Sequence, residues 1–349
     1  MGSDSNSNIV QRKARHIEVC TQPSDREIQV GKTGFERVRL PHRSLPQLSW
    51  DEIRLECLFL NRTVKLPLFI SCMTGGSDEG YRANRELATA AQKAGIAVGL
   101  GSHRILFRHP EVFEHFHLRP YAPDVPLLSN IGGVQVRDLH PTQLVEMNKR
   151  LEVDAQVIHL NPAQELFQEN GDKDFRGIRE AIARFVEVSP IPVIVKETGC
   201  GLSPEEVLDL VNLGVAYVDV AGHGGTSWIM VEAARGTQEE WEEAQDFADW
   251  GWPTADILIH LRGESSLKNK ILASGGLRSA MDLAKSLALG ASLGGMALPF
   301  IQAVVKGGSE AVLQLIQKIE KNLRRIHLLT GCRSPQELST LPLEIFPAR

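Results

Sequence analysis

The chain has 349 residues, of which 42% are hydrophobic and 23% charged, and its formal net charge is −5. This balance is typical of a globular protein with a large core, and no basic tract interleaved with aromatic residues indicates nucleic-acid binding. The five cysteines form no Cys-x-x-Cys pair, so the sequence predicts neither a disulfide framework nor a zinc site and fits a reducing compartment. No membrane-length apolar run or signal-peptide core is present, so we expect a cytoplasmic protein without a membrane segment.

From Leu66 onward, short apolar runs alternate with amphipathic stretches. Continuous apolar runs favour strands that are buried on both faces of a parallel sheet. The eight runs are Leu66–Ser71, Ala97–Ser102, Leu127–Gly132, Ala155–Leu160, Pro192–Glu197, Tyr217–Gly222, Ile271–Gly276 and Ala291–Ala297. Helical stretches between them include Asn84–Ala94, Phe175–Val188, Pro204–Leu213 and Ser279–Leu289. We therefore predict an α/β fold, a (β/α)8 TIM barrel, in preference to a doubly wound sheet, which more often has fewer parallel strands.

The segment before Leu66 lacks this alternation, so we expect residues 1–65 to form an N-terminal extension, an arm or cap, on a barrel of residues 66–349. The longest gap between predicted strands separates the sixth from the seventh. It contains an acidic stretch around Trp241 and then the residues Trp250–Thr254. A lid or an oligomer contact would account for this gap, and an extra amphipathic surface helix explains it equally well.

Glycine pairs occur at the ends of the last two predicted strands. They are Gly275-Gly276, with Arg278 close behind, and Gly294-Gly295, followed by Met296 and Ala297. Glycine lets backbone N–H groups approach an anion closely, and the loops after the seventh and eighth strands form the common phosphate site of this fold. We predict that these residues bind the phosphate of a flavin mononucleotide (FMN), although tight turns alone would also require glycine.

Polar side chains end the other strands, where the active site of a barrel enzyme lies. Candidates for contact with a flavin are Ser71, Met73, Thr74, Ser102, Asn130, Lys196, Thr226 and Ser227. We expect Lys196 to balance negative charge on a reduced flavin, because a charge at an inner strand end is costly without a purpose. A structural ion pair between Lys196 and Glu197 is the alternative, and His223 fits a structural role as well as a functional one.

The loop after the fourth predicted strand concentrates polar groups, with His159, Asn161, Gln164 and Glu165 in close succession. Glu165 offers the hard oxygen ligand that Mg²⁺ prefers. A carboxylate beside a diphosphate would repel it unless a cation lay between them. Asn161 and Gln164 offer neutral hydrogen bonds to a substrate. A polar capping loop without catalytic function is the plainer interpretation.

A basic cluster stands near the N-terminus, where Arg12, Lys13 and His16 share one face if the segment is helical. Such a face suits the high negative charge of a diphosphate. A basic run near a terminus is more often only solvated, so this cluster alone does not establish a binding site.

In combination, these segments resemble the type 2 isopentenyl diphosphate isomerase family. The motifs that carry the resemblance are RKARH at 12–16, MTGG at 73–76, GSHR at 101–104, SNIGG at 129–133, HLNPAQE at 159–165, VKETGCGLS at 195–203, GHGGTSW at 222–228, WGWPT at 250–254 and ASGGLRSAMDLAKSLALGA at 273–291. Several are weak alone, but in this order they are highly specific. His103 departs from the pattern, because many members have Gln there.

The resemblance implies a barrel that binds FMN, requires Mg²⁺ and accepts reducing equivalents from NADPH. It implies a homotetramer or homo-octamer that acts on isopentenyl diphosphate and dimethylallyl diphosphate. Substrate contacts are implied for Arg12, Lys13, His16, Arg104, His159, Asn161 and Gln164, a metal ligand for Glu165, and flavin contacts for the strand-end residues named above.

The implied reaction is a 1,3-shift of a proton along an alkene, which is a very weak base and needs a well-placed acid. The motifs contain no side-chain pair that obviously suits this task. We interpret reduced FMN as the proton carrier, with Gln164 near the reacting carbons as the candidate catalytic side chain. Two alternatives are a flavin oxidoreductase acting on a 2-hydroxy acid and a barrel that binds a phosphate ligand without catalysis.

Overall fold

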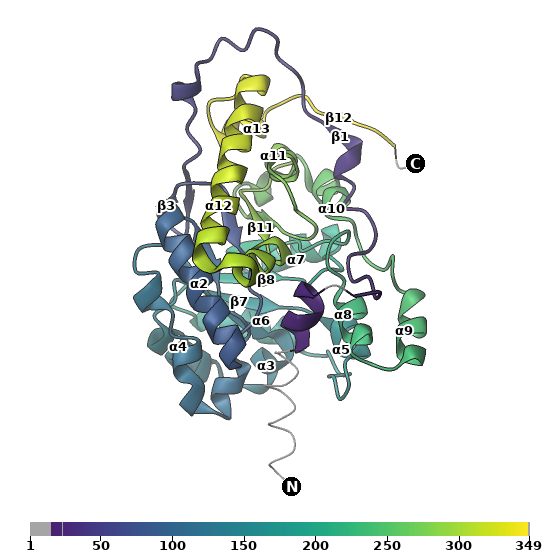
Figure 1. Ribbon diagram of the computed structural model, residues 1–349. Helices are drawn as coiled ribbons and strands as arrows, with labels where there is room; N and C mark the ends of the chain where they lie inside the picture. Colours follow the sequence, from purple (N-terminus) through teal and green to yellow (C-terminus); the bar gives the residue numbers. More distant parts are fainter. Residues whose placement is uncertain (1–14, 23, 348–349) are drawn as a thin grey trace.

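The computed structural model describes residues 15–22 and 24–347 (Figure 1). Its centre is a closed barrel of eight parallel strands, and each strand lies within one of the eight predicted runs. The strands are β4 (Leu68–Ile70), β5 (Ala97–Gly99), β6 (Leu127–Gly132), β7 (Ala155–His159), β8 (Val193–Lys196), β9 (Tyr217–Asp219), β10 (Ile271–Ala273) and β11 (Leu293–Met296). β11 pairs with both β10 and β4, which closes the barrel and confirms the predicted (β/α)8 fold.

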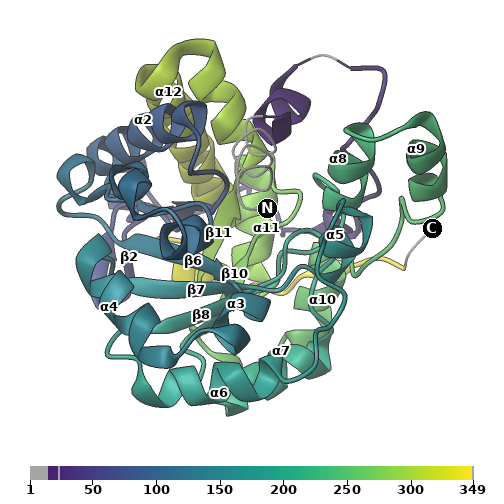
Figure 2. The ribbon, with the colours of Figure 1, turned by 90° about the horizontal axis from the view of Figure 1, so that it is seen from below.

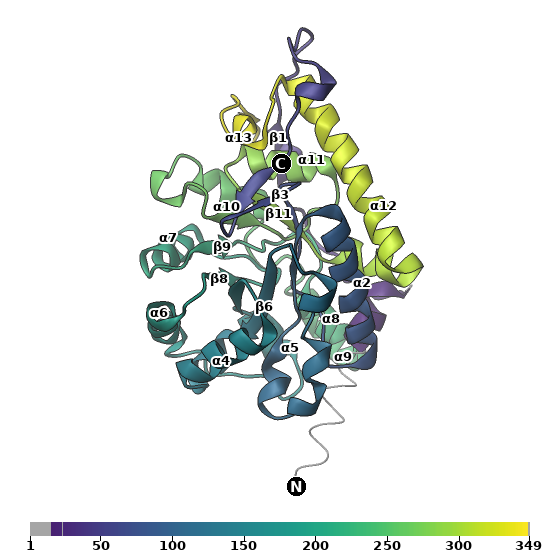
Figure 3. The same ribbon diagram turned by 90° about the vertical axis from the view of Figure 1, so that its left-hand side faces the viewer.

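Helices surround the strands (Figure 3). They are α2 (Asp78–Ala94), α3 (Gly133–Asp138), α4 (Pro141–Leu151), α5 (Pro162–Phe167), α6 (Ile178–Val188), α7 (Pro204–Asn212), α8 (Trp228–Ala234), α9 (Gln238–Gln245), α10 (Thr254–Leu261), α11 (Ala280–Ala288), α12 (Leu298–Thr330) and α13 (Pro335–Leu338). Helix α12 is kinked at Gly307 and Gly308, and Ser309 N donates to Glu86 of α2 just after the kink. None of the helices described is both long and apolar enough to span a membrane.

Two connections in the barrel differ from the others, which contain one or two α-helices each. After β5 the chain forms only short 3-10 turns, η3 (His103–Phe107), η4 (Pro110–His115) and η5 (Arg119–Tyr121). Between β9 and β10 lie three helices, and α9 is a mostly exposed surface helix with Ala244 as its buried contact. The segment in which a lid or a surface helix was expected therefore contains a surface helix, and its role as a lid stays a prediction.

A hairpin closes the amino-terminal end of the barrel. Strands β2 (Cys57–Phe59) and β3 (Arg62–Val64) pair antiparallel, and Cys57, Phe59 and Val64 are buried. They pack against inward-facing side chains of the barrel strands, including Phe69, Leu128, Ile194 and Leu272. In Figure 2 the strands run from β2 on the left toward α5 and α8 on the right, where the carboxyl-terminal mouth lies.

The N-terminal segment crosses the opposite, open end of the barrel. Residues 15–21 are helical, and Ile17 packs against Leu298 and Ile301 at the start of α12. Further along, Gln29 forms a bridge with Thr226, so this part of the chain lies along the loop after β9. The segment then continues through η1 (Phe35–Arg37), β1 (Val38–Arg39) and η2 (Trp50–Glu52), and β1 pairs with β12 (Glu344–Ile345).

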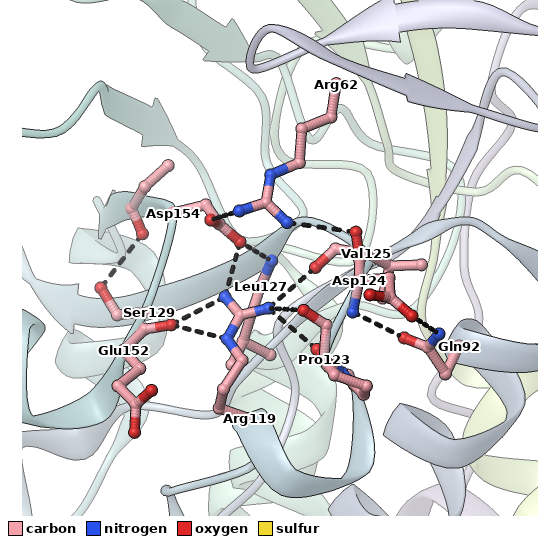
Figure 4. Close-up of polar contacts among 12 residues, drawn as sticks. Arg62, Gln92, Arg119, Pro123, Asp124, Val125, Leu127, Ser129, Glu152 and Asp154 are labelled. Carbon is pink, nitrogen blue, oxygen red and sulfur yellow. Dashed lines mark hydrogen bonds and ion pairs between the residues drawn. The ribbon is translucent and has the colours of Figure 1, made fainter.

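Arg119 organises the amino-terminal ends of β6 and β7 (Figure 4). Its guanidinium donates to the Glu152 carbonyl and to Asp154 Oδ2 at 2.7 Å each, and to the carbonyls of Ala122, Pro123 and Val125. Arg62 of the hairpin donates to the other Asp154 oxygen at 2.7 Å. One carboxylate therefore joins the hairpin, the turn before β6 and the strand β7.

Arg119→Ala should lower the free energy of unfolding by ~3 kcal/mol, because it removes the partly buried cationic partner of Asp154 and the side-chain donor to several carbonyls. Arg39→Ala is the matched control. Arg39 is 68% exposed in its ion pair with Glu344, and its loss should cost less than ~1 kcal/mol. Urea unfolding of both variants measures the difference, and equal losses would show that Arg119 has no special structural role.

Candidate active site

A cavity of about 170 Å³ lies at the carboxyl ends of the barrel strands. The predicted residues that line it are His16, Met73, Thr74, Ser102, Arg104, Asn130, His159, Asn161, Gln164, Glu165, Lys196, Thr226 and Ala297. Substrate, metal and flavin candidates from nearly all strand ends thus converge on one space. Arg12 and Lys13 lie outside the described residues.

The other predicted flavin residues lie around this cavity but do not line it. They are Ser71, Ser227, Gly275, Gly276, Arg278, Gly294, Gly295 and Met296. Ser227 caps α8 by accepting from Met230 N at 3.4 Å. Arg278 donates to Gln29 Oε1 of the N-terminal segment and, at 3.5 Å, to Thr226 Oγ1. The side chain of Thr226 therefore lies between Arg278 and the cavity.

The four predicted glycines are required for different structural reasons. Gly275 and Gly276 have φ of 94° and 74°, which favours glycine, and a Cβ on Gly276 would meet Thr33 at 2.2 Å. A Cβ on Gly294 would meet Leu283 of α11, and one on Gly295 would meet Phe69 inside the barrel, both at 2.4 Å. Close packing thus explains Gly294 and Gly295 without an anion, whereas the turn at 275–276 leaves the phosphate hypothesis open.

Lys196 lies in the uppermost layer of the barrel interior. Strand pairing places it beside His159 on one side and Asp219 on the other. Its Nζ donates to the Glu197 carbonyl oxygen at 2.6 Å. The Glu197 carboxylate instead accepts from the backbone N–H groups of the loop 199–201. Among the residues described, the predicted alternative of a direct Lys196–Glu197 ion pair is therefore not formed.

A chain of hydrogen bonds fixes Gln164 from both ends. Asn161 Nδ2 donates to Gln164 Oε1 at 3.0 Å, and Gln164 Nε2 donates to Glu232 Oε1 at 2.8 Å. This arrangement directs the Gln164 amide nitrogen toward Glu232 and leaves its second N–H available to a ligand. Pro162 at the first turn of α5 and Asn161 before it place both amides at the start of that helix.

Glu232, on α8, is the centre of this cluster, and its side chain is completely buried. His16 Nε2 lies 3.0 Å from Glu232 Oε1, and Arg235, one turn further along α8, pairs with Oε2. Burial raises the pKa of Glu232, but the hydrogen bonds from His16 and Gln164 and the charge of Arg235 outweigh it and lower this pKa to about 2. The carboxylate is therefore ionised and ties the N-terminal helix to α5 and α8.

Glu165 has the environment of a preorganised oxygen ligand. It is 5% exposed, and it accepts from Asn161 Nδ2, Gln168 Nε2 and Asp172 N at 2.9–3.1 Å. Three donors leave part of its acceptor capacity unused. No group of three or more His, Cys, Asp or Glu that could hold a metal occurs in residues 15–22 and 24–347. A cation here would depend on Glu165 and on oxygens of a ligand, which is how Mg²⁺ commonly binds with phosphates.

One of two buried hydroxyl groups fits a flavin at this site. Ser71 Oγ and Thr74 Oγ1 find no hydrogen-bond partner within the described part of the chain, and Thr74 lines the cavity. Buried hydroxyls without partners are costly, so a bound ligand with polar edges would satisfy Thr74. Together with Asn130, Lys196 and Thr226, Thr74 forms a donor-rich wall suited to the carbonyl edge of a flavin.

Sequence analysis overlooked several residues of this site. Glu232 and Arg235 are the most important, followed by Trp228, whose ring meets that of His16 edge-on at 5.0 Å, and by Gln168 and Thr198 on the cavity wall. The spacing of Glu232 and Arg235 on one helical face was visible in the sequence. Nothing there indicated that this face meets the N-terminal segment.

Comparison with known proteins decides the family. Isopentenyl-diphosphate delta-isomerase from Borrelia garinii subsp. bavariensis is 42% identical over 331 residues, covering 95% of this chain and 92% of that protein. The Synechococcus sp. enzyme of the same name is 43% identical over 93% of each chain. The chain belongs to the isopentenyl-diphosphate delta-isomerase family. This confirms the resemblance found in the sequence.

Other matches agree on the fold and the cofactor. The family model described as FMN-dependent dehydrogenase matches residues 132–344, which supports FMN as the cofactor. Among solved structures, a flavocytochrome b2 variant matches with a TM-score of 0.70 at 18% identity, over 97% of this chain and 83% of that chain. A putative lactate oxidase from Pediococcus acidilactici matches with a TM-score of 0.67 at 15% identity, over 99% and 93%. At such identity these structures support the barrel alone.

Glu232→Gln should lower the free energy of unfolding at pH 7 by ~3 kcal/mol, since the native pKa of about 2 lies well below the ordinary 4.5. A depressed carboxyl pKa stabilises the fold above the unfolded-state pKa, and this stabilisation is lost as pH falls toward 2. The difference in free energy of unfolding between wild type and variant should therefore become smaller below pH ~4.5. Urea unfolding at several pH values tests this, with the exposed Glu344→Gln as control; a gap independent of pH would refute it.

Proposed function

We propose that this enzyme interconverts isopentenyl diphosphate and dimethylallyl diphosphate, using reduced FMN and Mg²⁺, in isoprenoid biosynthesis. The observation that carries the proposal is the convergence of Gln164, Glu165 and Lys196 on one cavity, in a chain that belongs to this isomerase family. A binding barrel without catalysis would not need a buried, ionised Glu232 behind Gln164.

The diphosphate of the substrate would lie between the N-terminal segment and α5. His16 and Arg104 line the cavity, and Arg12 and Lys13 stand just before His16 in the chain. Arg12, Lys13 and Arg104 would donate charge-assisted hydrogen bonds to the phosphate oxygens. Glu165 would hold Mg²⁺ against the same oxygens, which removes the repulsion between carboxylate and diphosphate.

Proton transfer along the alkene would occur beside Gln164. Asn161 and Glu232 hold this amide in one orientation, so its remaining N–H is fixed relative to the reacting carbons. When bound in its reduced form, FMN supplies an electron-rich ring and a proton-carrying nitrogen. Lys196, within the same wall, would balance the negative charge of that form, and Asn130 and Thr226 would orient its polar edge.

Two further features, the use of NADPH and the oligomeric state, rest on the family resemblance alone, and the proposed compartment rests on the composition of the sequence. We propose that NADPH reduces the flavin, that the active form is a homotetramer or homo-octamer, and that the enzyme is cytoplasmic. Flavin reduction, sedimentation velocity and cell fractionation test them separately.

Anaerobic incubation of the purified protein with isopentenyl diphosphate, FMN, Mg²⁺ and NADPH tests the proposed function. Dimethylallyl diphosphate should accumulate with many turnovers per NADPH oxidised, because the isomerisation is redox-neutral. Omission of Mg²⁺ should abolish turnover while leaving the flavin spectrum unchanged. Consumption of an electron acceptor in proportion to product would instead support a flavin oxidoreductase, and flavin binding without any product would refute the isomerase assignment.

Gln164→Ala should lower kcat by about 100-fold or more, the usual effect of removing a group that positions or transfers a proton. Bound flavin should remain, because Gln164 faces Asn161 and Glu232 rather than the flavin wall. Gln238→Ala on the exposed helix α9 is a matched control that removes an amide from a surface contact with Glu242. Full activity of the Gln164 variant would exclude the proposed role.

A further inference from the structure

Asp219 is a buried charge that the proposed function does not use. It ends strand β9 and is 2% exposed. Sequence analysis treated it only as part of an apolar run. An ionised carboxylate in such a place is costly unless it is paired, so its retention in the barrel interior calls for a partner with a purpose.

Asp219 and Lys196 occupy neighbouring positions in the top layer of the barrel. They are direct partners in the pairing of β8 with β9, and side chains of paired residues on adjacent strands point to the same face. Two residues earlier, Ile194 and Tyr217 belong to the inward-facing hydrophobic cluster. Lys196 and Asp219 therefore project into the barrel one layer above it, on the side of the cavity.

Hydrogen bonds and a neighbouring charge oppose the effect of burial on Asp219. Ser274 donates to it twice, from N to Oδ1 and from Oγ to Oδ2, at 2.9 Å each, and Ala221 N donates to Oδ1 at 3.4 Å. Burial is the largest influence and raises the pKa of Asp219, and the largest influence that opposes burial is the charge of Lys196. For Glu197, burial likewise raises the pKa, but three backbone N–H groups each oppose it more strongly than Lys196 does. Of these two carboxyl groups, Asp219 is therefore the one for which Lys196 is the leading influence that opposes burial.

We propose that Asp219 balances the charge of Lys196 from the neighbouring position in the barrel interior, and so sets the net charge presented to the flavin at this site. The inference rests on the proposed binding of FMN. The other titratable groups around Lys196 are few. Cys72 is a neutral thiol because burial raises its pKa to about 12, His159 is the strand partner on the other side, and the Glu197 carboxylate faces its own loop. Arg104 and Glu165 line the same cavity.

The decisive measurement is the midpoint potential of bound FMN at neutral pH, in the holoenzyme and in Asp219→Asn. Without the carboxylate, the charge of Lys196 is no longer balanced and stabilises the reduced, negative flavin, so the potential should rise.

Two further variants separate this role from a structural one. In a Lys196→Met background, Asp219→Asn should change the potential much less than it does alone, because the charge on which it acts is gone. Ser274→Ala retains the carboxylate but removes one of its donors, so it should shift the potential in the same direction by a smaller amount. This variant keeps the test available if Asp219→Asn fails to fold. Asp209→Asn, at an exposed ion pair with Arg179, is the charge control and should leave the potential unchanged.

The outcomes distinguish this inference from the proposed function. Turnover in the wild type, together with an unchanged potential in Asp219→Asn and Ser274→Ala, would overturn the inference alone. A purified protein that takes up no FMN would overturn the proposed function and this inference with it. A raised potential in Asp219→Asn, with a KM for isopentenyl diphosphate within about twofold of wild type, would support the inference, because the diphosphate contacts lie on other residues.

Discussion

Closure of the parallel barrel is the constraint on which the rest of the structure depends. It fixes the register of all eight strands, so a step of two residues along each strand moves from one interior layer to the next. Val157, Ile194 and Leu272 belong to the inward-facing apolar cluster, and two residues later on the same strands come His159, Lys196 and Ser274. On these strands the interior therefore changes from apolar to polar toward the mouth. The hairpin β2–β3 packs against the apolar cluster, and the cavity lies at the polar end.

The open end is completed by segments that are distant in the sequence. Glu232 of α8 joins Gln164 of α5 to His16 of the N-terminal helix, and Ile17 of that helix packs on the start of α12. Because the central carboxylate has no exposure to solvent, loss of any one donor leaves a buried charge less well compensated. The N-terminal segment is thereby held over the mouth by electrostatics as well as by apolar contacts, and it brings His16 to the site.

The sequence was sufficient for the barrel and for most of the cavity wall. All eight strands were predicted because strands buried on both faces read as unbroken apolar runs, and strand ends in this fold converge at the mouth. The hairpin of residues 57–64 was missed because its two strands are only three residues long and half exposed. Glu232 and Asp219 were missed for a different reason. Their importance comes from partners more than 20 residues away, Gln164 and Lys196 or Ser274, and no local pattern reports such contacts.

The glycines after the last strand illustrate a limit of motif-based inference. The prediction assigned Gly294 and Gly295 to a phosphate site because of their place in the fold. In the structure the same residues are required by the close approach of Leu283 and Phe69. Glycine at these two positions would suit either a phosphate site or close packing, and packing alone is sufficient to explain why both residues are glycine. The turn at Gly275 and Gly276, with both residues at positive φ, makes the stronger case for a backbone shaped around an anion.

The shared fold does not determine the chemistry. Structures of lactate oxidase and flavocytochrome b2 superpose on this barrel at 15–18% identity, although their names describe redox enzymes. A barrel mouth with a flavin site can serve either kind of reaction, so the distinction has to come from side chains that contact the substrate. The side chains that we propose for this contact are a neutral amide fixed between Asn161 and Glu232, a carboxylate suited to Mg²⁺, and the basic residues of the N-terminal segment. This set matches a diphosphate whose hydrocarbon end must gain and lose a proton, and it provides little for the carboxylate of a 2-hydroxy acid.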